Sequence, residues 1–542
     1  MSRKNLPLSI DSTDSSSTKP TVSLTPAKQT CLTFLILIIS LSVIGCGARD
    51  ERDELPRQIE PAGNPTHPSQ HSKPSAPARK INQFVHVSEK DPTRLVLDDG
   101  APYLPIGINI GWTPDGTPVR PDTVSAYFES RFARCESNGI NIVRVWLATW
   151  FINPETPGDL ESLDAVFSAA QKHGIRVILA LDNAHDIVHN PHRHPLINAI
   201  GKGFAGDRIE AYFSHPDARA AYQARCRLLI DRYADEPALA IWELCNEIDL
   251  TLTSLDDATD ETGAIKRIET RADWVRVMTA FLKETDPARR PVTVSVSDWQ
   301  GKYAALGRHP SIDIITPHEY LPATDAVFRP DQRDEYYSLA AIVRECLADN
   351  KPVICLEYGL RSSGATLSRA PFDPDGSHMR HFLWTSAFMP YAGPAFPWWW
   401  DDYIFGRRLD PLWRPLSDWR SDFNPAPGEK IVWLNNADDL NAPVLMTALK
   451  TETTAAGYIR SAALSWSNVL AAGERGERLV PGDIRRARIA AGQFPPGDYI
   501  AFFIRPSNGE RLTDSQFIHT GGELIVPLPD FSDDLGFRIE KR

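Results

Sequence analysis

The stretch ALAIWELCNEID at residues 238–249 decides the fold, because an apolar run ends abruptly there in an amide and a carboxylate, Asn246 and Glu247. This pattern predicts a buried strand of a parallel sheet whose carboxyl end opens into a site. The run PVICLEYG at residues 352–359 has the same pattern and ends in Glu357. Two buried strands that each deliver a Glu indicate paired carboxylates, which can serve as acid/base and nucleophile at an acetal carbon.

Helices and strands alternate through the region around these two runs. Helical patterns at residues 126–139 and 161–174 close with Asn-Gly and His-Gly, and a strand that starts with isoleucine follows each. Eight strands are predicted in all, at residues 106–112, 140–147, 175–182, 238–249, 292–297, 312–320, 352–359 and 394–401. The alternation implies a parallel sheet. Because no Gly-x-Gly-x-x-Gly turn follows the first strand, we predict a (β/α)8 TIM barrel rather than a dinucleotide-binding sheet.

In the last part of the chain, residues 429–542, the pattern of apolar residues changes from alternating helices and strands to short strands. Short strands separated by turns are predicted at residues 444–449, 463–466, 499–504 and 524–528. They are typical of a small all-β sandwich domain, which leaves residues 81–428 for the barrel. At the start of the barrel, residues 84–87 and 95–97 predict a hairpin that closes its bottom.

The N-terminal segment predicts export. Residues 32–46 are apolar but shorter than the ~20 residues that a membrane-spanning helix needs, and they end in Val-Ile-Gly-Cys, which resembles a bacterial lipobox with Cys46 as the lipidated residue. We therefore expect a signal peptide at residues 1–45, a disordered linker at residues 46–80, and a membrane-anchored lipoprotein of the periplasm or cell surface. A short transmembrane anchor and an ordinary signal peptide cleaved elsewhere are the alternatives.

The composition excludes several classes of function. The 542 residues include 58 Lys and Arg against 70 Asp and Glu, a net charge of −12, and form no basic stripe, so we expect no nucleic-acid partner. The seven cysteines show no C-x-x-C spacing, and without Cys31 and Cys46 of the leader their number is odd. This predicts neither a disulfide framework nor a zinc site. We expect a monomer that acts on a neutral substrate without a metal or organic cofactor.

The strand ends resemble a known family. WELCNE at residues 242–247 and LEYG at residues 356–359 resemble the two catalytic strands of glycoside hydrolase family 5 and its retaining (β/α)8 relatives. The resemblance covers about residues 84–425. It extends to Arg144 ending the second strand, to His318 and Tyr320 after the sixth, and to Trp399 or Trp398 after the eighth. The tail resembles the sandwich that often follows such barrels, through residues 458–461, 496–499 and 527–534.

The resemblance implies a retaining glycoside hydrolase that cleaves β-linked chains of the mannan or glucan type, with Glu247 as the acid/base and Glu357 as the nucleophile. Such a mechanism needs an ionised Glu357, whose pKa Arg144 would lower, and a Glu247 whose pKa is raised. Asn246 would hold the sugar 2-hydroxyl, and Trp399 would form an apolar floor for the sugar ring. His318 and Tyr320 complete the implied substrate-binding residues.

Other residues near the strand ends receive roles from their position. Trp112 lies beyond the end of the first strand and is predicted to be a sugar platform. The family usually places a His directly after the third strand, whereas His185 comes a few positions later; we assign it to substrate binding. Glu243 shares the inward face with Glu247 but lies deeper, so we expect it to pair with a buried Arg. The insertions at residues 190–213 and 321–334 are expected to shape the subsites.

Three other interpretations stay open. The two Glu residues could be structural ion-pair partners near strand ends. The protein could be a non-catalytic lipoprotein that binds carbohydrate on the same fold. It could also be a metal-dependent hydrolase that uses the His-rich loop of His185, His189, His192 and His194. The sugar, the linkage and the choice between endo and exo action are not readable from these residues.

Overall fold

The computed structural model describes residues 81–542, except 202, 254–260, 323–328, 362–368 and 436–442. The predicted signal peptide, Cys46 and the linker at residues 46–80 lie outside the described residues. Among the residues that are described, no helix is both long and apolar enough to cross a membrane.

The predicted barrel is confirmed, and parallel strands form its wall. Its named strands are β4 (Gly107–Asn109), β5 (Ile142–Trp146), β6 (Arg176–Ala180), β7 (Leu239–Glu243), β8 (Val292–Thr293), β9 (Ser295–Val296), β10 (Thr316–Leu321) and β11 (Glu357–Leu360). Strands β4 to β8 pair in chain order, and β9, β10 and β11 continue the wall. The fifth predicted strand is thus divided into β8 and β9 at Val294.

The eighth predicted strand, residues 394–401, is not a regular strand. Pro397 forms a single parallel bridge with Tyr358 of β11. Its carbonyl oxygen also accepts a hydrogen bond from the backbone N–H of Asn109 in β4, at 3.3 Å. A π-helical turn, η5 (Trp400–Phe405), begins directly afterwards. Proline lacks the backbone N–H that a ladder of hydrogen bonds needs, so the two prolines of this segment prevent a regular strand. The hydrogen bonds that remain still close the barrel between β11 and β4.

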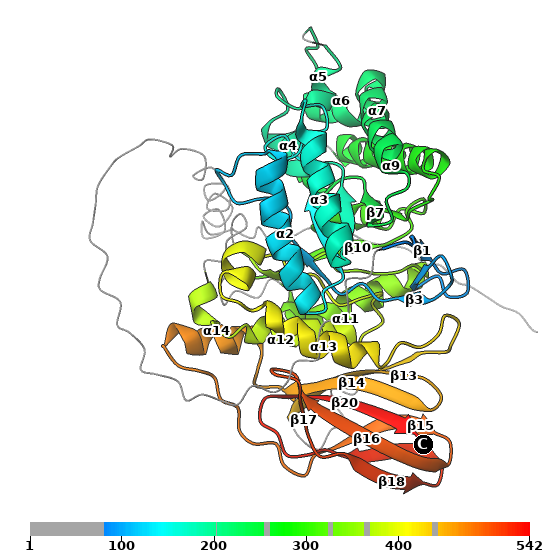
Figure 1. Ribbon diagram of the computed structural model, residues 1–542, viewed down its shortest axis with the longest axis vertical. Helices are drawn as coiled ribbons and strands as arrows, with labels where there is room; N and C mark the ends of the chain where they lie inside the picture. The colour runs from blue at the N-terminus through cyan, green and yellow to red at the C-terminus, as the bar shows by residue number, and fades with distance from the viewer. Residues whose placement is uncertain (1–80, 202, 254–260, 323–328, 362–368, 436–442) are drawn as a thin grey trace, which may run out of the picture. The chain divides into compact units, whose positions relative to one another are not determined.

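Helices cover the outside of the barrel. The longer ones are α2 (Pro121–Ser137), α3 (Asp159–His173), α7 (Pro216–Tyr233), α9 (Glu261–Thr285), α11 (Glu335–Cys346), α12 (Ser377–Ala387) and α13 (Trp413–Ser421). Short helical segments in the loops are α4 (Ala184–His189), α5 (Pro195–Asn198), α6 (Arg208–Ser214), α8 (Leu250–Thr253), α10 (Ala304–Gly307), η2 (Pro330–Arg333), η3 (Leu347–Asp349), η4 (Ala370–Phe372) and η6 (Asp410–Leu412). Figure 1 shows α2, α3, α7 and α9 around β7 and β10.

A hairpin at the N-terminal side of the barrel strands closes the bottom, as predicted. It consists of β1 (Val85–Val87), β2 (Leu95–Leu97) and the short β3 (Pro102–Tyr103). Val85 and Leu95 are buried in one cluster with barrel residues Ile142, Ile178, Ala240, Ile241, Ile314, Ile354, Leu356 and Phe396. The Phe396 ring lies so close to Gly107 that a Cβ there would be 2.0 Å from it. The barrel interior is therefore a packed core that leaves only the opposite end for a site.

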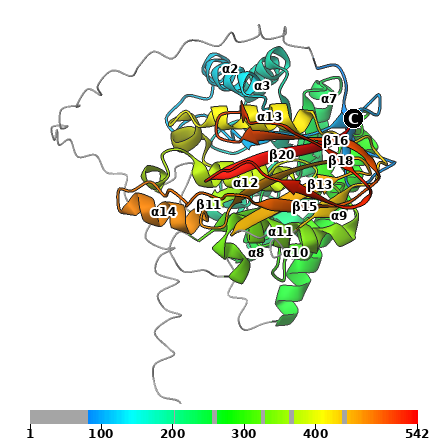
Figure 2. The same ribbon diagram turned by 90° about the horizontal axis from the view of Figure 1, so that it is seen from below.

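An antiparallel β domain follows the barrel, with two sheets around a shared apolar core (Figure 2). Its elements are β12 (Val432–Leu434), β13 (Val444–Lys450), β14 (Thr454–Ser461), α14 (Trp466–Glu474), β15 (Arg488–Phe494), β16 (Gly497–Arg505), β17 (Glu510–Arg511), β18 (Ser515–His519), β19 (Gly522–Pro527) and β20 (Asp534–Lys541). The predicted strand at residues 463–466 is wrong. Ser465 instead caps α14, because its side chain accepts a hydrogen bond from the backbone N–H of Asn468.

The β domain and the barrel share buried polar contacts. The indole N–H of Trp466 donates to the carbonyl oxygen of Gln332 at 2.8 Å. Arg380 of α12 donates to Asp534 of β20 at 2.8 Å. Such buried partners need each other, since an unpaired buried donor or charge is costly.

Candidate active site

Arg144 of β5 organises the mouth of the barrel. Its fully buried guanidinium donates twice to Glu243, at 2.6 and 2.8 Å, and once to Glu357, at 2.6 Å. It also donates to Asn246 at 2.6 Å and to Asn109 at 3.2 Å. Glu243 is therefore the deep ion-pair partner that alternation along β7 predicts. One planar fork aligns two carboxylates and two amides because the geometry of Arg is rigid.

Glu247 lies just beyond β7 in an unusual backbone conformation. Its φ is +50°, in the left-handed region that non-glycine residues rarely adopt. Its backbone N–H donates to the hydroxyl of Ser295, which in turn donates to Glu243 at 2.7 Å. Strain of this kind persists only where surrounding contacts enforce it, and it is concentrated at functional sites.

Glu357, the first residue of β11, faces Glu247 across the barrel mouth. The Tyr320 hydroxyl donates to Glu357, and Nδ1 of His318 lies 3.0 Å from Glu247 and 3.5 Å from Glu357. An oxygen of each carboxylate and a His318 nitrogen all lie within 4.8 Å of one another. His185 contributes a longer contact, with Nε2 3.7 Å from Glu247.

The two carboxylates line a cavity of about 900 Å³. Its aromatic lining residues are Trp112, Trp146, Trp150, Tyr320, Trp398 and Trp399, and its polar ones are His185, Ser297, Asp298, Glu319, Arg329, Gln332 and Arg361 beside Glu247 and Glu357. The Trp399 indole packs on Gly359, where an added Cβ would lie 2.6 Å from the indole nitrogen. Only glycine lets this ring lie so close to β11. An apolar, aromatic cavity with a few convergent polar groups is the usual form of a small-molecule or glycan site.

The two carboxylates differ in their electrostatic surroundings. Burial raises the pKa of Glu357, and His318 and Arg144 offset only part of this effect. Burial acts in the same direction on Glu247, but hydrogen bonds from His185 and His318 outweigh it and lower the pKa of Glu247. The pKa is thus raised for Glu357 and lowered for Glu247, which is the reverse of the expected order. The reason is that Arg144 divides its charge between Glu357 and Glu243, whereas hydrogen bonds from both His185 and His318 act on Glu247.

The pKa values of the two histidines are shifted as well. The pKa of His185 is raised, chiefly by its hydrogen bond with Glu247. Burial lowers the pKa of His318, but the charges of Glu357 and Glu247 outweigh this and raise it overall. The lowered pKa of Glu247 therefore depends on two protonated histidines, and it must rise when they become neutral.

The structure brings the nine predicted barrel-mouth residues together. Glu247, Glu357, Tyr320, Trp399, Trp112 and His185 line the cavity, and Arg144, Asn246 and His318 lie directly behind the carboxylates. The amide nitrogen of Asn246 is buried and has no hydrogen-bond partner among the described residues. A buried donor of this kind is available to a ligand hydroxyl.

Sequence reasoning missed several lining residues, among them Glu319, Arg329 and Arg361. The insertion at residues 321–334 signalled part of this wall, because it supplies Arg329 and Gln332. Of the described residues at 190–213, none lines this cavity. Glu319 was not predicted, because strand alternation places it on the opposite face of the strand from its neighbours His318 and Tyr320.

The described histidines of the His-rich loop are not gathered into a group of three possible metal ligands. In the described part of the chain, the group that could offer three or more ligands is Glu247, His318 and Glu357. His194 is instead buried against Asp182, 3.1 Å from its carboxylate, and the rings of His185 and His189 stack on each other with centroids 5.9 Å apart. Burial against Asp182 turns His194 inward, away from its neighbours on the loop.

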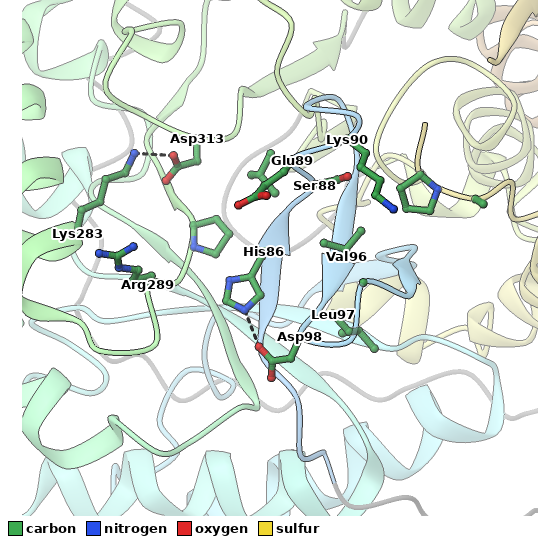
Figure 3. A pocket seen from close by; sticks show the side chains of 15 residues that line it. His86, Ser88, Glu89, Lys90, Val96, Leu97, Asp98, Lys283, Arg289 and Asp313 are labelled. Carbon is green, nitrogen blue, oxygen red and sulfur yellow. Dashed lines mark hydrogen bonds and ion pairs between the residues drawn. The ribbon is translucent and has the colours of Figure 1, made fainter. Parts of the chain in front are cut away.

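A separate hollow of about 750 Å³ lies along the N-terminal hairpin (Figure 3). Two pairs form among its lining side chains, His86 with Asp98 at 2.7 Å and Lys283 with Asp313 at 2.5 Å. None of the predicted site residues lines it. The predicted site residues therefore lie apart from this hollow.

Comparisons with known proteins agree with this geometry. Residues 116–385 match the family model described as cellulase (glycosyl hydrolase family 5). A probable mannan endo-1,4-beta-mannosidase F of Aspergillus flavus is 24% identical over 320 residues, which are 52% of this chain and 62% of that protein. The mannan endo-1,4-beta-mannosidase 1 of Oryza sativa subsp. japonica is 27% identical over 311 residues, 49% of this chain and 67% of that protein. The chain thus spans about three fifths of the length of the first of these relatives.

Solved structures show the same fold. One described as a glycoside hydrolase has a TM-score of 0.56 at 13% identity and covers 85% of this chain and 97% of its own. A glycoside hydrolase family 5 protein from Bacteroides vulgatus has a TM-score of 0.52 at 14% identity, with 85% and 94% covered. Both similarities extend past the barrel, because the barrel alone is a smaller share of this chain.

Proposed function

With the barrel identified as a glycoside hydrolase domain of the family 5 type, we propose that the protein is a retaining β-mannan hydrolase that uses Glu247 and Glu357. The observation that carries this proposal is the separation of the two carboxylates, which have oxygens within 4.8 Å of each other. Retaining enzymes place their carboxyl groups about 5–5.5 Å apart, whereas inverting enzymes need about 6.5–9.5 Å to admit a water.

In the first step, a Glu357 oxygen attacks the anomeric carbon while the bond to the leaving oxygen breaks. Glu247 gives its proton to that oxygen, and a glycosyl ester of Glu357 forms. Arg144 and Tyr320 hold Glu357 in position for the attack. Burial favours the protonated Glu247 that an acid needs, and the positive charges of His185 and His318 oppose it.

In the second step, the Glu247 carboxylate takes a proton from water, and the water oxygen attacks the anomeric carbon. The ester bond breaks, Glu357 leaves as a carboxylate, and the sugar keeps its β configuration. Asn246 donates its free amide N–H to the sugar 2-hydroxyl, a contact that strengthens as the oxocarbenium-like transition state forms. Trp399 and Trp112 pack against the sugar faces.

The substrate class rests on the relatives. Those described above are named as mannan endo-1,4-beta-mannosidases, so we propose a β-1,4-linked mannan or its oligosaccharides. For localisation, we propose that the leader exports the chain and that Cys46 carries the lipid. Incorporation of labelled palmitate by the wild type, and its loss in Cys46→Ser, tests the anchor.

The test of function compares the full chain with its Glu357→Ala variant on β-mannans, β-glucans and xylans. We expect the wild type to cleave β-mannan and Glu357→Ala to lose roughly three orders of magnitude or more of that activity. A 2-deoxy-2-fluoro-β-mannoside should label the peptide that contains Glu357. The variant Glu284→Ala, an exposed Glu on α9, is the matched control and should be unaffected. Label on any other peptide, or inversion at the anomeric carbon, contradicts the proposal.

A further inference from the structure

The cavity wall beyond the catalytic pair carries a further buried carboxylate, Glu319. It lies on β10 between His318 and Tyr320 and is 2% exposed. Its oxygens accept hydrogen bonds from Arg329 at 2.7 and 2.8 Å, from Gln332 at 2.9 Å and from the indole N–H of Trp299 at 2.5 Å. Burying a carboxylate is expensive unless every partner is in place, so this site is built to hold something in position.

The group held in position is the guanidinium of Arg329. Glu319 accepts two hydrogen bonds from its Nη2, and Asp331 receives weaker ones from the same side chain at 3.3 to 3.4 Å. The guanidinium carbon lies 5.0 Å from the centroid of the Trp299 ring. The Arg329 side chain is still 25% exposed and lines the same cavity as Glu247 and Glu357. The hydrogen bonds described for the Arg329 guanidinium run from Nε and Nη2.

The β domain stabilises this wall from behind. Gln332 donates to Glu319, while its own carbonyl oxygen accepts the indole N–H of Trp466 at the start of α14. Trp466 also donates its backbone N–H to Glu335 at 3.1 Å. Both tryptophan contacts are buried. The segment that carries Arg329 is therefore fixed to the barrel at Glu319 and to the β domain at Trp466.

We propose that Arg329 is a substrate-binding residue for a sugar unit adjoining the scissile bond, and that Glu319 is the positioning residue that fixes it. This inference rests on the proposed function. Nη1 of Arg329 donates to a sugar hydroxyl, while Nη2 stays bonded to Glu319. Because Glu319 and Asp331 together compensate the positive charge of Arg329, the wall selects a neutral hexose unit rather than one that bears a carboxylate.

The test measures kcat and KM on a series of manno-oligosaccharides of increasing length for Arg329→Gln, Arg329→Lys and Glu319→Gln. Arg333→Gln is the matched control, since Arg333 is an exposed residue of η2, the helix that Arg329 precedes, and does not line the cavity. We expect Arg329→Gln to raise KM about tenfold or more with little change in kcat, and to shift which bond is cleaved. Arg329→Lys should recover part of the loss, and Arg333→Gln should stay within about twofold of the wild type.

A double variant separates positioning from a merely structural role. If Glu319 acts through Arg329, Glu319→Gln should add nothing to the KM of Arg329→Gln. Binding is measured by calorimetry in the Glu357→Ala background, where neutral manno-oligosaccharides should bind more tightly than oligomannuronates. Equal behaviour of Arg329→Gln and Arg333→Gln, additive effects in the double variant, or tighter binding of the acidic chain overturns the inference. A wild type that cleaves no mannan defeats the proposed function instead, which keeps the two failures distinct.

Discussion

Replacing His185 by alanine should move the alkaline limb of the pH profile to higher pH. His185 lies 3.7 Å from the Glu247 carboxylate, and its hydrogen bond lowers the pKa of Glu247 against the effect of burial. Removing the imidazole removes a cation, so the pKa of Glu247 rises. Glu247 must be protonated to assist the leaving group, and it then keeps its proton to higher pH.

The size of the shift follows from the geometry. The His185 side chain is 50% exposed, so the interaction is screened almost as in water. At that dielectric, two unit charges 3.7 Å apart interact by about 1.1 kcal/mol, and one pKa unit corresponds to about 1.36 kcal/mol. The alkaline limb should therefore move up by about 0.8 pH unit, and by less where His185 is already neutral.

The assay is kcat/KM for a manno-oligosaccharide across the pH range, because this quantity reports the ionisations of the free enzyme. His192→Ala is the matched control, since His192 is an exposed residue of the same loop and makes none of the contacts described for Glu247. The reasoning is refuted if the alkaline limb of His185→Ala stays in place or moves to lower pH while His192→Ala matches the wild type.

Two predictions concern stability. Arg144→Met should lower the free energy of unfolding by about 3–5 kcal/mol, because it leaves Glu243 and Glu357 buried without the guanidinium that pairs with both. Arg414→Met breaks an exposed pair with Asp418 and should cost under about 0.5 kcal/mol in the same urea titration. Equal losses would contradict the burial argument. The pKa of Glu335 is raised to about 8, chiefly by burial and then by Asp334. Since the native state keeps a proton that the unfolded chain releases near 4.5, the free energy of unfolding should fall as the pH rises from 4.5 to 8. In urea titrations across that window, Glu335→Gln should show a weaker dependence of stability on pH than the wild type, and an unchanged dependence would be the contrary result.

The residues at the strand ends show how far the sequence reaches. Alternation along β7 and β11 predicts which residues face the mouth, because parallel barrel strands carry side chains inward with a period of two. The apolar runs and the helix-ending glycines likewise predict the barrel order, since burial and capping are local properties of a segment.

Segments with weak local signals were harder to assign. The eighth wall segment of the barrel, residues 394–401, has the sequence pattern of an apolar strand. It is joined to β4 and β11 by a few hydrogen bonds that no local pattern encodes. Residues 463–466 read as a short strand, yet Ser465 starts a helix whose Trp466 is buried against Gln332. In both places tertiary contacts override local preference, because a short apolar run is equally compatible with several buried structures.

By itself, the sequence determined the barrel, the β domain after it, and the nine side chains gathered at the mouth. Only the tertiary structure decided how these side chains share charge: Arg144 serves two carboxylates, two imidazoles lower the pKa of Glu247, and Glu319 fixes Arg329 with support from Trp466. The physical reason is that residue type and spacing fix burial and direction along one strand. Electrostatic coupling depends instead on distances of a few ångströms between strands and domains that lie far apart in the chain.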